Sequence, residues 1–242
     1  MAIAYLTSTI KASNTDTVTT DAIDTSGADL LVLYAVQQTA TVTPDAPTDS
    51  KGNSWTKGTP FADPMGIYMT VYWCKPTSVG TGHTFTYATT GTTTGPEVVV
   101  LAFSGSVASS PFDDQTDATT TDTPVTSLQM TSLTPSEANC LLIACHLSKY
   151  DSGTLSINQS YTLAQSNEDS VPNNYSMGAA YLIQTSAAAS APTYSWPNTH
   201  SAGGLLVSFK AATATGQFAR PASDVSPNGI LRFDCVGHHL IG

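Results

Sequence analysis

The stretch Ala28-Asp29-Leu30-Leu31-Val32-Leu33 returns later in the chain as Ala138-Asn139-Cys140-Leu141-Leu142-Ile143. Both copies end in a continuous apolar run, which is expected of a central strand covered on both faces. Val99-Val100-Leu101-Ala102-Phe103 is a second such run, and Leu205-Leu206-Val207-Ser208-Phe209 matches it. Together these runs predict a β fold built from two internally similar halves.

Two shorter matches keep the same order along the chain. Ser54-Trp55-Thr56 matches Ser160-Tyr161-Thr162, and Thr84-Phe85-Thr86-Tyr87 matches Thr193-Tyr194-Ser195-Trp196. Such an internal repeat has two explanations: two similar sandwiches in tandem, or two equivalent sheets that close on one another as a single jelly-roll-like sandwich. We favour the single sandwich because no Pro- or Gly-rich linker separates the halves.

The rest of the chain also reads as all-β. No window has sustained helical periodicity, and short apolar or alternating runs are broken by Gly, Pro, Asn, Asp and Ser. The predicted strands are 28–36, 66–74, 83–88, 97–104, 125–133, 139–147, 175–184 and 204–210. The polar segment 104–122 is predicted to be a long loop with local turns. We therefore expect an antiparallel β-sandwich over 1–212, with halves 1–105 and 106–212, and an extended C-terminal arm over 213–242.

The charge balance excludes two classes of partner. Only 11% of the 242 residues are charged, and the net charge is −10 with 8 Lys and Arg. Nucleic-acid binding requires clustered cations, and an anionic membrane surface would repel this chain. The N-terminus lacks a basic region followed by a long apolar stretch, which predicts no signal peptide. We expect synthesis in a cytoplasm, with release by another route such as lysis of a host cell.

No metal site or cofactor is predicted. Cys235 and His238-His239 lack a fourth ligand at a recognised spacing, and the acidic segment 113–117, with Asp122, lacks the spacing of a calcium loop. Three other cysteines lie in apolar strand-like runs and are interpreted as buried free thiols. They are Cys74, Cys140 and Cys145.

Catalysis is not predicted either. The chain has no GxSxG elbow and no Cys/His signature, and its only glutamates are Glu97, Glu137 and Glu168. His83 and His146 fall in strand runs, where a packing role is expected. Asp45, Asp49 and Asn53 are explained by a tight connection leading into the tryptophan at position 55.

Aromatic residues suggest one candidate binding surface. Ring faces can stack on the apolar faces of sugars, whereas repeat-matched rings are also expected of a packed core. The candidate glycan-stacking residues are Trp55, Trp73, Tyr161, Tyr175 and Trp196.

The segment Asp49-Ser50-Lys51-Gly52-Asn53-Ser54-Trp55 and the later run Val99–Phe103 followed by Ser104-Gly105 resemble a known pattern. A DSxGNxW turn and a VVVxxFSG strand occur in this order in jelly-roll-like proteins of phages and bacteria, often virion or fibre components. The resemblance covers about the first 210 residues. It implies a β-sandwich with a role at the virion surface, and it supplies no catalytic residues. Residues 220–226 also resemble a linker of such proteins, but the following residues 228–231 depart from that pattern.

These observations lead to three functional hypotheses. The first is a structural virion protein of a bacteriophage: a capsid decoration, fibre or tail component that self-associates, binds other virion proteins and contacts host-surface glycans. The second is an extracellular carbohydrate-binding module or lectin-like adhesin. The third is a glycan-cleaving enzyme on a sandwich scaffold, which requires two carboxylates facing each other across a cleft.

Overall fold

The computed structural model describes residues 2–38, 46–63, 66–89, 95–105, 110–120, 123–149, 153–167 and 175–211. In this part of the chain the regular elements are all strands, and every strand pair is antiparallel. The predicted all-β sandwich class is therefore confirmed. No helix long and apolar enough to span a membrane occurs among these residues. The predicted arm over 213–242 lies outside them.

Among the described residues, the first half of the chain contains nine strands. They are β1 (Ala4–Ala12), β2 (Thr17–Thr19), β3 (Leu30–Gln38), β4 (Thr48–Asp49), β5 (Thr56–Lys57), β6 (Phe61–Ala62), β7 (Ile67–Cys74), β8 (Phe85–Ala88) and β9 (Glu97–Ser104). The second half contains eight: β10 (Phe112–Thr119), β11 (Val125–Gln129), β12 (Cys140–Lys149), β13 (Ser156–Ile157), β14 (Thr162–Asn167), β15 (Tyr175–Gln184), β16 (Thr193–His200) and β17 (Ala202–Phe209).

Each half arranges its strands in the same order. In the first half, the large sheet has the order β1-β9-β3-β7-β5, and β6 also pairs with β7. In the second half, the large sheet has the order β10-β17-β12-β15-β14. A three-stranded small sheet has the order β2-β8-β4 or β11-β16-β13. The chain crosses repeatedly between large and small sheets. Within each half this alternation is typical of jelly-roll sandwiches, and the jelly-roll topology stays a prediction.

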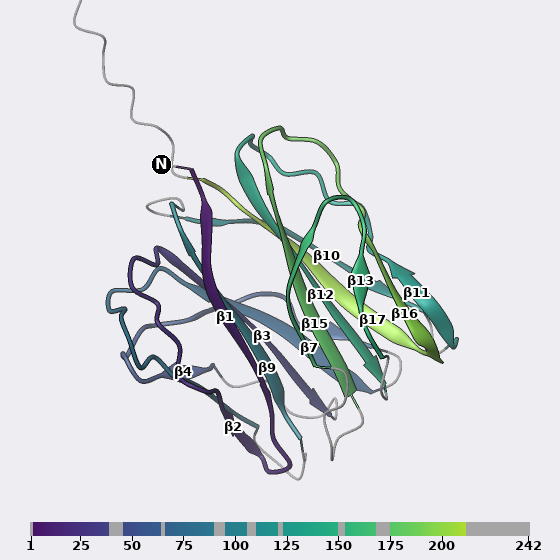
Figure 1. The fold of residues 1–242 in the computed structure, drawn as a ribbon, viewed down its shortest axis with the longest axis horizontal. Helices are drawn as coiled ribbons and strands as arrows, with labels where there is room; N and C mark the ends of the chain where they lie inside the picture. The colour runs from purple at the N-terminus through teal and green to yellow at the C-terminus, as the bar shows by residue number, and fades with distance from the viewer. Residues whose placement is uncertain are drawn as a thin grey trace, which may run out of the picture.

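The four sheets form four layers, which Figure 1 shows from the first half in purple and blue to the second in green. In each half the small sheet covers one face of the large sheet and encloses a core of its own. The two large sheets face each other across a third core to which both halves contribute. The structure thus differs from the favoured single pair of sheets: it has two sandwiches joined through a shared core.

The apolar runs explain why two sheets would not suffice. In β3, Leu30, Val32 and Tyr34 point into the shared core, whereas Leu31 and Leu33 point into the core of the first half. All five are fully buried. Burying one such Leu or Val side chain contributes about 1.5–3 kcal/mol, so both faces need a cover. The prediction that these runs are central strands buried on both sides is confirmed.

One repeat match is displaced by a residue. Leu30 pairs with Phe103, and in the second half Leu141 pairs with Phe209. Leu30 therefore corresponds to Leu141, although the sequence match aligns it with Cys140. Because side chains alternate between faces, a shift of one residue assigns every side chain of the strand to the wrong core. The match of Phe103 to Phe209 is confirmed, since both rings lie in the shared core.

The predicted strands 97–104 and 175–184 agree with β9 and β15 to the residue. The predicted loop 104–122 is wrong, because it contains the eight-residue strand β10. In the described part of the chain, this strand lies at the edge of its sheet and has β17 as its one partner. Most of its residues are partly or fully exposed, and the sequence there is polar. An edge strand of this composition has little hydrophobic alternation for a sequence pattern to detect.

Candidate functional site

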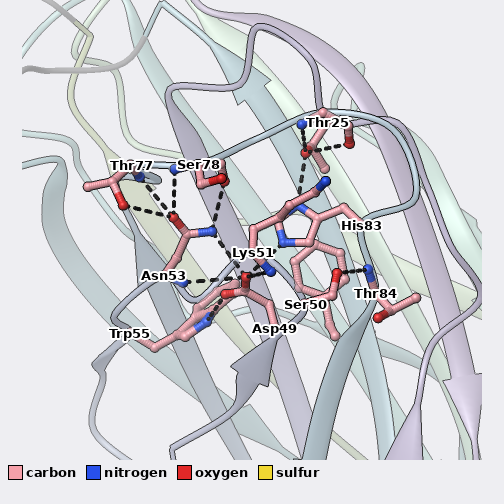
Figure 2. A network of polar contacts seen from close by, with 12 residues as sticks. Thr25, Asp49, Ser50, Lys51, Asn53, Trp55, Thr77, Ser78, His83 and Thr84 are labelled. Carbon is pink, nitrogen blue, oxygen red and sulfur yellow. Dashed lines mark hydrogen bonds and ion pairs between the residues drawn. The ribbon is translucent and has the colours of Figure 1, made fainter.

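The DSxGNxW turn forms a dense polar network around Asp49, which ends β4 (Figure 2). Its Oδ1 accepts hydrogen bonds from the Lys51 backbone N–H at 2.9 Å and from Asn53 Nδ2 at 3.1 Å. Its Oδ2 accepts a hydrogen bond from Trp55 Nε1 at 2.9 Å. His83 Nε2 lies 2.9 Å from Oδ1 as well. One carboxylate therefore fixes the turn, the tryptophan that ends it and His83, which lies two residues before β8.

Asn53 clamps this turn to the segment that follows β7. Its Oδ1 accepts hydrogen bonds from the backbone N–H of Thr77 at 2.8 Å and of Ser78 at 3.0 Å, and its Nδ2 donates to Ser78 O at 3.0 Å. Gly52 supplies the left-handed conformation of the turn, with φ of 74°. The predicted tight connection at Asp49 and Asn53 is confirmed. Asp45 lies outside the described residues.

A hydroxyl, an imidazole and a carboxylate follow one another in this network. Thr25 Oγ1 is 2.8 Å from His83 Nδ1, and His83 Nε2 faces Asp49. The order resembles a nucleophile–base–acid relay. However, Thr25 and His83 are fully buried, and Thr25 Oγ1 also accepts a hydrogen bond from the Gly80 backbone N–H at 3.1 Å. A substrate cannot reach this hydroxyl, so the arrangement stabilises the fold.

A groove of about 600 Å³ lies beside this network, between the end of β7 and the start of β10. Trp73 and Phe112 stack at its wall, with ring centroids 4.4 Å apart and planes inclined by 12°. Asn53 holds together the two polar walls, which contain Thr56 and Thr77. The full lining is Ser54, Thr56, Trp73, Cys74, Lys75, Pro76, Thr77, Ser110, Pro111 and Phe112. Its mixture of rings, hydroxyls and one ammonium group suits a small polar ligand.

The structure does not bring the five candidate stacking residues together. Trp73 and Tyr175 belong to the shared core, Tyr161 and Trp196 to the core of the second half, and Trp55 packs against the core of the first half. Four of them are at most 9% exposed, and Trp55 is half-buried. Because they lie in three separate clusters, they form no common platform. Only Trp73 lines the groove.

The remaining predicted residues have structural partners. Cys74, Cys140 and Cys145 are buried free thiols, as predicted, and burial raises the pKa of Cys74 to about 12. Asp113, from the acidic segment, accepts hydrogen bonds from the Ser136 backbone N–H at 2.8 Å and from Ser208 Oγ at 3.1 Å. Within the described ranges, no three His, Cys, Asp or Glu side chains are grouped as metal ligands would be. Asp122, Glu168, Cys235, His238 and His239 lie outside these ranges.

Glu97 is a buried ionisable residue that the sequence pattern does not mark as a candidate for a functional site. It begins β9, is fully buried in the interface between the halves, and accepts a hydrogen bond from Asn167 Nδ2 at 3.0 Å through Oε1. Its Oε2 has no hydrogen-bond partner. Burial raises the pKa of Glu97 to about 8, against a smaller lowering by the Asn167 hydrogen bond. A protonated, neutral carboxyl fits this site.

His146 is the second buried ionisable group. It was predicted to pack within a strand, and it lies beside the rings of Tyr194 and Trp196, at centroid distances of 5.3 and 4.7 Å. Neither ring nitrogen has a hydrogen-bond partner, and burial lowers its pKa to about 3. The imidazole is therefore neutral in the fold. Because the unfolded chain takes up this proton near pH 6.5, acid between pH 6.5 and 3 favours unfolding.

Comparison with known proteins assigns no family to this geometry. No family model matches the chain, and neither a curated protein nor a solved structure gives a significant match. The resemblance of the DSxGNxW turn to phage proteins therefore stays a prediction.

We expect Asp49→Asn to lower the free energy of unfolding by roughly 2–3 kcal/mol, because the carboxylate accepts hydrogen bonds from buried donors. Burial raises the pKa of Asp49, but the hydrogen bonds from His83, Trp55, Lys51 and Asn53 outweigh burial and lower it below 3.8. The stabilisation is thus present above pH 3.8 and is lost as pH falls through the lowered value. Urea unfolding at pH 7 measures the effect. Exposed Asp24→Asn is the control, and an equal loss in both variants would contradict the prediction.

We expect Glu97→Gln to stabilise the protein at pH 8 and to be near neutral at pH 4. The unfolded chain ionises Glu97 near pH 4.5, whereas the fold retains the proton up to about pH 8. Stability therefore falls as pH rises between these values and is constant above them. The gain at pH 8 is on the order of 3–5 kcal/mol.

Thermal or urea unfolding across this pH range measures the gain, with exposed Glu137→Gln as the control. A difference between Glu97→Gln and the parent protein that does not change with pH would rule out a buried, protonated Glu97.

Proposed function

We propose that this protein is a structural component of a bacteriophage particle, a decoration, fibre or tail protein that self-associates on the virion surface and has no catalytic role. The observation that carries the proposal is the structural role of the DSxGNxW turn. Asp49, Asn53 and Trp55 are the residues through which the chain resembles phage virion proteins, and all three hold the turn in place. The likeness thus rests on architecture, as expected for a building block.

The construction of the body supports this role. Two sandwiches joined through a shared apolar core form one stiff unit, because the large sheets are packed on both of their faces. The low content of charged residues and the net charge of −10 suit a hydroxyl-rich exterior that stays soluble at high local concentration.

The exposed sheet edges limit how such units would assemble. β10 is an edge strand that carries the exposed carboxylates of Asp114 and Asp117. If a second copy paired edge to edge with β10, these carboxylates would lie next to it. Like charges at an edge oppose extension of the sheet by a second copy. Contacts through loops and the outer faces of the small sheets are therefore favoured over pairing along β10.

Mass spectrometry of purified particles from the source, with negative-stain imaging of the isolated protein, tests this proposal. We expect many copies per particle and regular oligomers or fibres in the images. Absence from particles together with a monodisperse monomer would refute it and favour the second candidate.

The second candidate is a carbohydrate-binding module, and the groove beside Trp73 favours it. The groove combines an aromatic wall with hydroxyl groups and the side chain of Lys75, in a protein with few cations. Rings and hydroxyls complement the apolar and polar faces of a sugar. The same groove would give a virion protein a contact for host-surface glycans.

A glycan array followed by titration of any hit tests this second candidate. We expect Lys75→Ala to weaken binding by about tenfold, because a hydrogen bond from a charged donor is lost. Lys11→Ala, whose side chain pairs with Asp21 elsewhere, is the matched control and should bind normally. A blank array at high protein concentration would exclude glycan binding, and equal losses in both variants would exclude the groove.

A further inference from the structure

The two halves meet through corresponding residues. Tyr5 pairs with Phe103 in the first large sheet, and Phe112 pairs with Phe209 in the second. Tyr5 therefore corresponds to Phe112. Because Leu30 corresponds to Leu141, Val32 corresponds to Ile143. Trp73 pairs with Val32 and Tyr181 pairs with Ile143, so Trp73 corresponds to Tyr181.

These rings form two matching aromatic triads in the interface. In one, Tyr5 stacks on Tyr181 at 4.8 Å and 8°, and Phe103 meets Tyr181 edge-on at 5.6 Å. In the other, Phe112 stacks on Trp73 at 4.4 Å and 12°, and Phe209 meets Trp73 edge-on at 6.1 Å. In each triad, two rings come from one half and the third from the other half. Exchanging the halves converts one triad into the other.

Polar contacts follow the same exchange. Ser8 of β1 donates from Oγ to Ala164 O of β14 at 3.4 Å. Gln115 of β10 donates from Nε2 to Thr59 O, between β5 and β6, at 2.8 Å. Ser8 pairs with Leu101 and Gln115 with Val207, so the two donors occupy corresponding positions. The halves thus meet as the subunits of a twofold dimer do, by the same surface on both sides.

We infer that the facing large sheets are a docking interface that works between chains as well as within one, so that the first half of one copy binds the second half of another. The shared core resembles the interface of an obligate dimer, which is a domain core divided between two subunits. Each half also has a private core under its own small sheet, which holds its large sheet in shape. The inference does not rest on the phage assignment.

The ends of the interface add specificity. At one end Glu97 of the first half meets Asn167 of the second. The residue that corresponds to Glu97 is Gly203, because Glu97 pairs with Val36 and Gly203 with the corresponding Leu147. A Cβ on Gly203 would collide with the carboxylate of Asp63 and the ring of Phe61. Both buried carboxyl groups at the interface ends therefore come from the first half, and the second half supplies neutral partners.

This distribution selects which halves pair. Two first halves would place Glu97 against Asp63 at both ends, where a side chain already collides and two carboxyl groups would be buried together. The overlap with Asp63 and Phe61, and the burial of a second carboxyl group without a neutral partner, oppose association. A first half is therefore expected to bind a second half in preference to another first half.

The test uses the full chain with a protease site inserted between β9 and β10, after Gly105. After cleavage, we expect the two fragments to co-elute at micromolar concentration. When isotope-labelled and unlabelled cleaved proteins are mixed, native mass spectrometry should show first–second pairs of mixed label and few first–first pairs. Fragments that separate on cleavage, or that never exchange after mild denaturation and refolding, would overturn the inference.

Matched variants assign the result to the interface. Tyr5→Ala and Phe112→Ala each remove one ring from a triad and should raise the dissociation constant of the fragments by about tenfold. Trp55→Ala removes a half-buried ring from the core of the first half and should leave this constant unchanged. Glu97→Gly, which gives the first half the glycine that the second half has at position 203, should permit first–first pairs. Equal weakening by Trp55→Ala, or abundant first–first pairs in the parent protein, would refute the proposed specificity.

Discussion

The structure depends on one constraint: the central strands of both large sheets are apolar on their two faces. β3 directs alternate residues into the shared core and into the core of the first half, and β12 does the same in the second half with Leu141 and Leu142. A sheet of this kind needs a cover on each side. The three-stranded small sheet supplies one cover within each half. The other half supplies the second cover, and four layers are the result.

This double burial also explains why ionisable groups are held in unusual states. Glu97 lies between two sheets that both exclude water, so its neutral form is favoured, and His146 lies between a large and a small sheet with the same effect on the imidazole. Asp49 differs, because the turn surrounds its carboxylate with donors and favours the charged form. Glu97 is the more deeply buried of the two carboxyl groups and accepts one hydrogen bond, whereas Asp49 accepts several, so the neutral form is favoured at Glu97 and the charged form at Asp49.

The parts of the fold that the sequence predicts are those set by local apolar patterns. β9 and β15 agree with prediction to the residue, because each is a continuous or near-continuous apolar run. Edge strands such as β10 are missed, because their partners supply hydrogen bonds but little burial. The turn at Asp49 is predicted from its residue types, whereas its contact with His83 joins positions far apart in the chain. The burial of Glu97 depends on the opposite half, and no pattern around Glu97 indicates it.

The two halves share a strand order but have diverged in their polar interiors. Where the first half uses a carboxylate and an imidazole, those of Asp49 and His83, the corresponding turn of the second half uses amides: Asn158 Oδ1 accepts from the Thr193 backbone N–H at 2.7 Å, and Gln159 Oε1 from Ser190 Oγ at 3.2 Å. Covalent linkage keeps the halves at a high effective concentration, so neither must remain complementary to itself. Each is therefore free to become complementary to the other alone. The one-sided placement of Glu97 and Asp63 against Asn167 and Gly203 is the arrangement that this freedom allows.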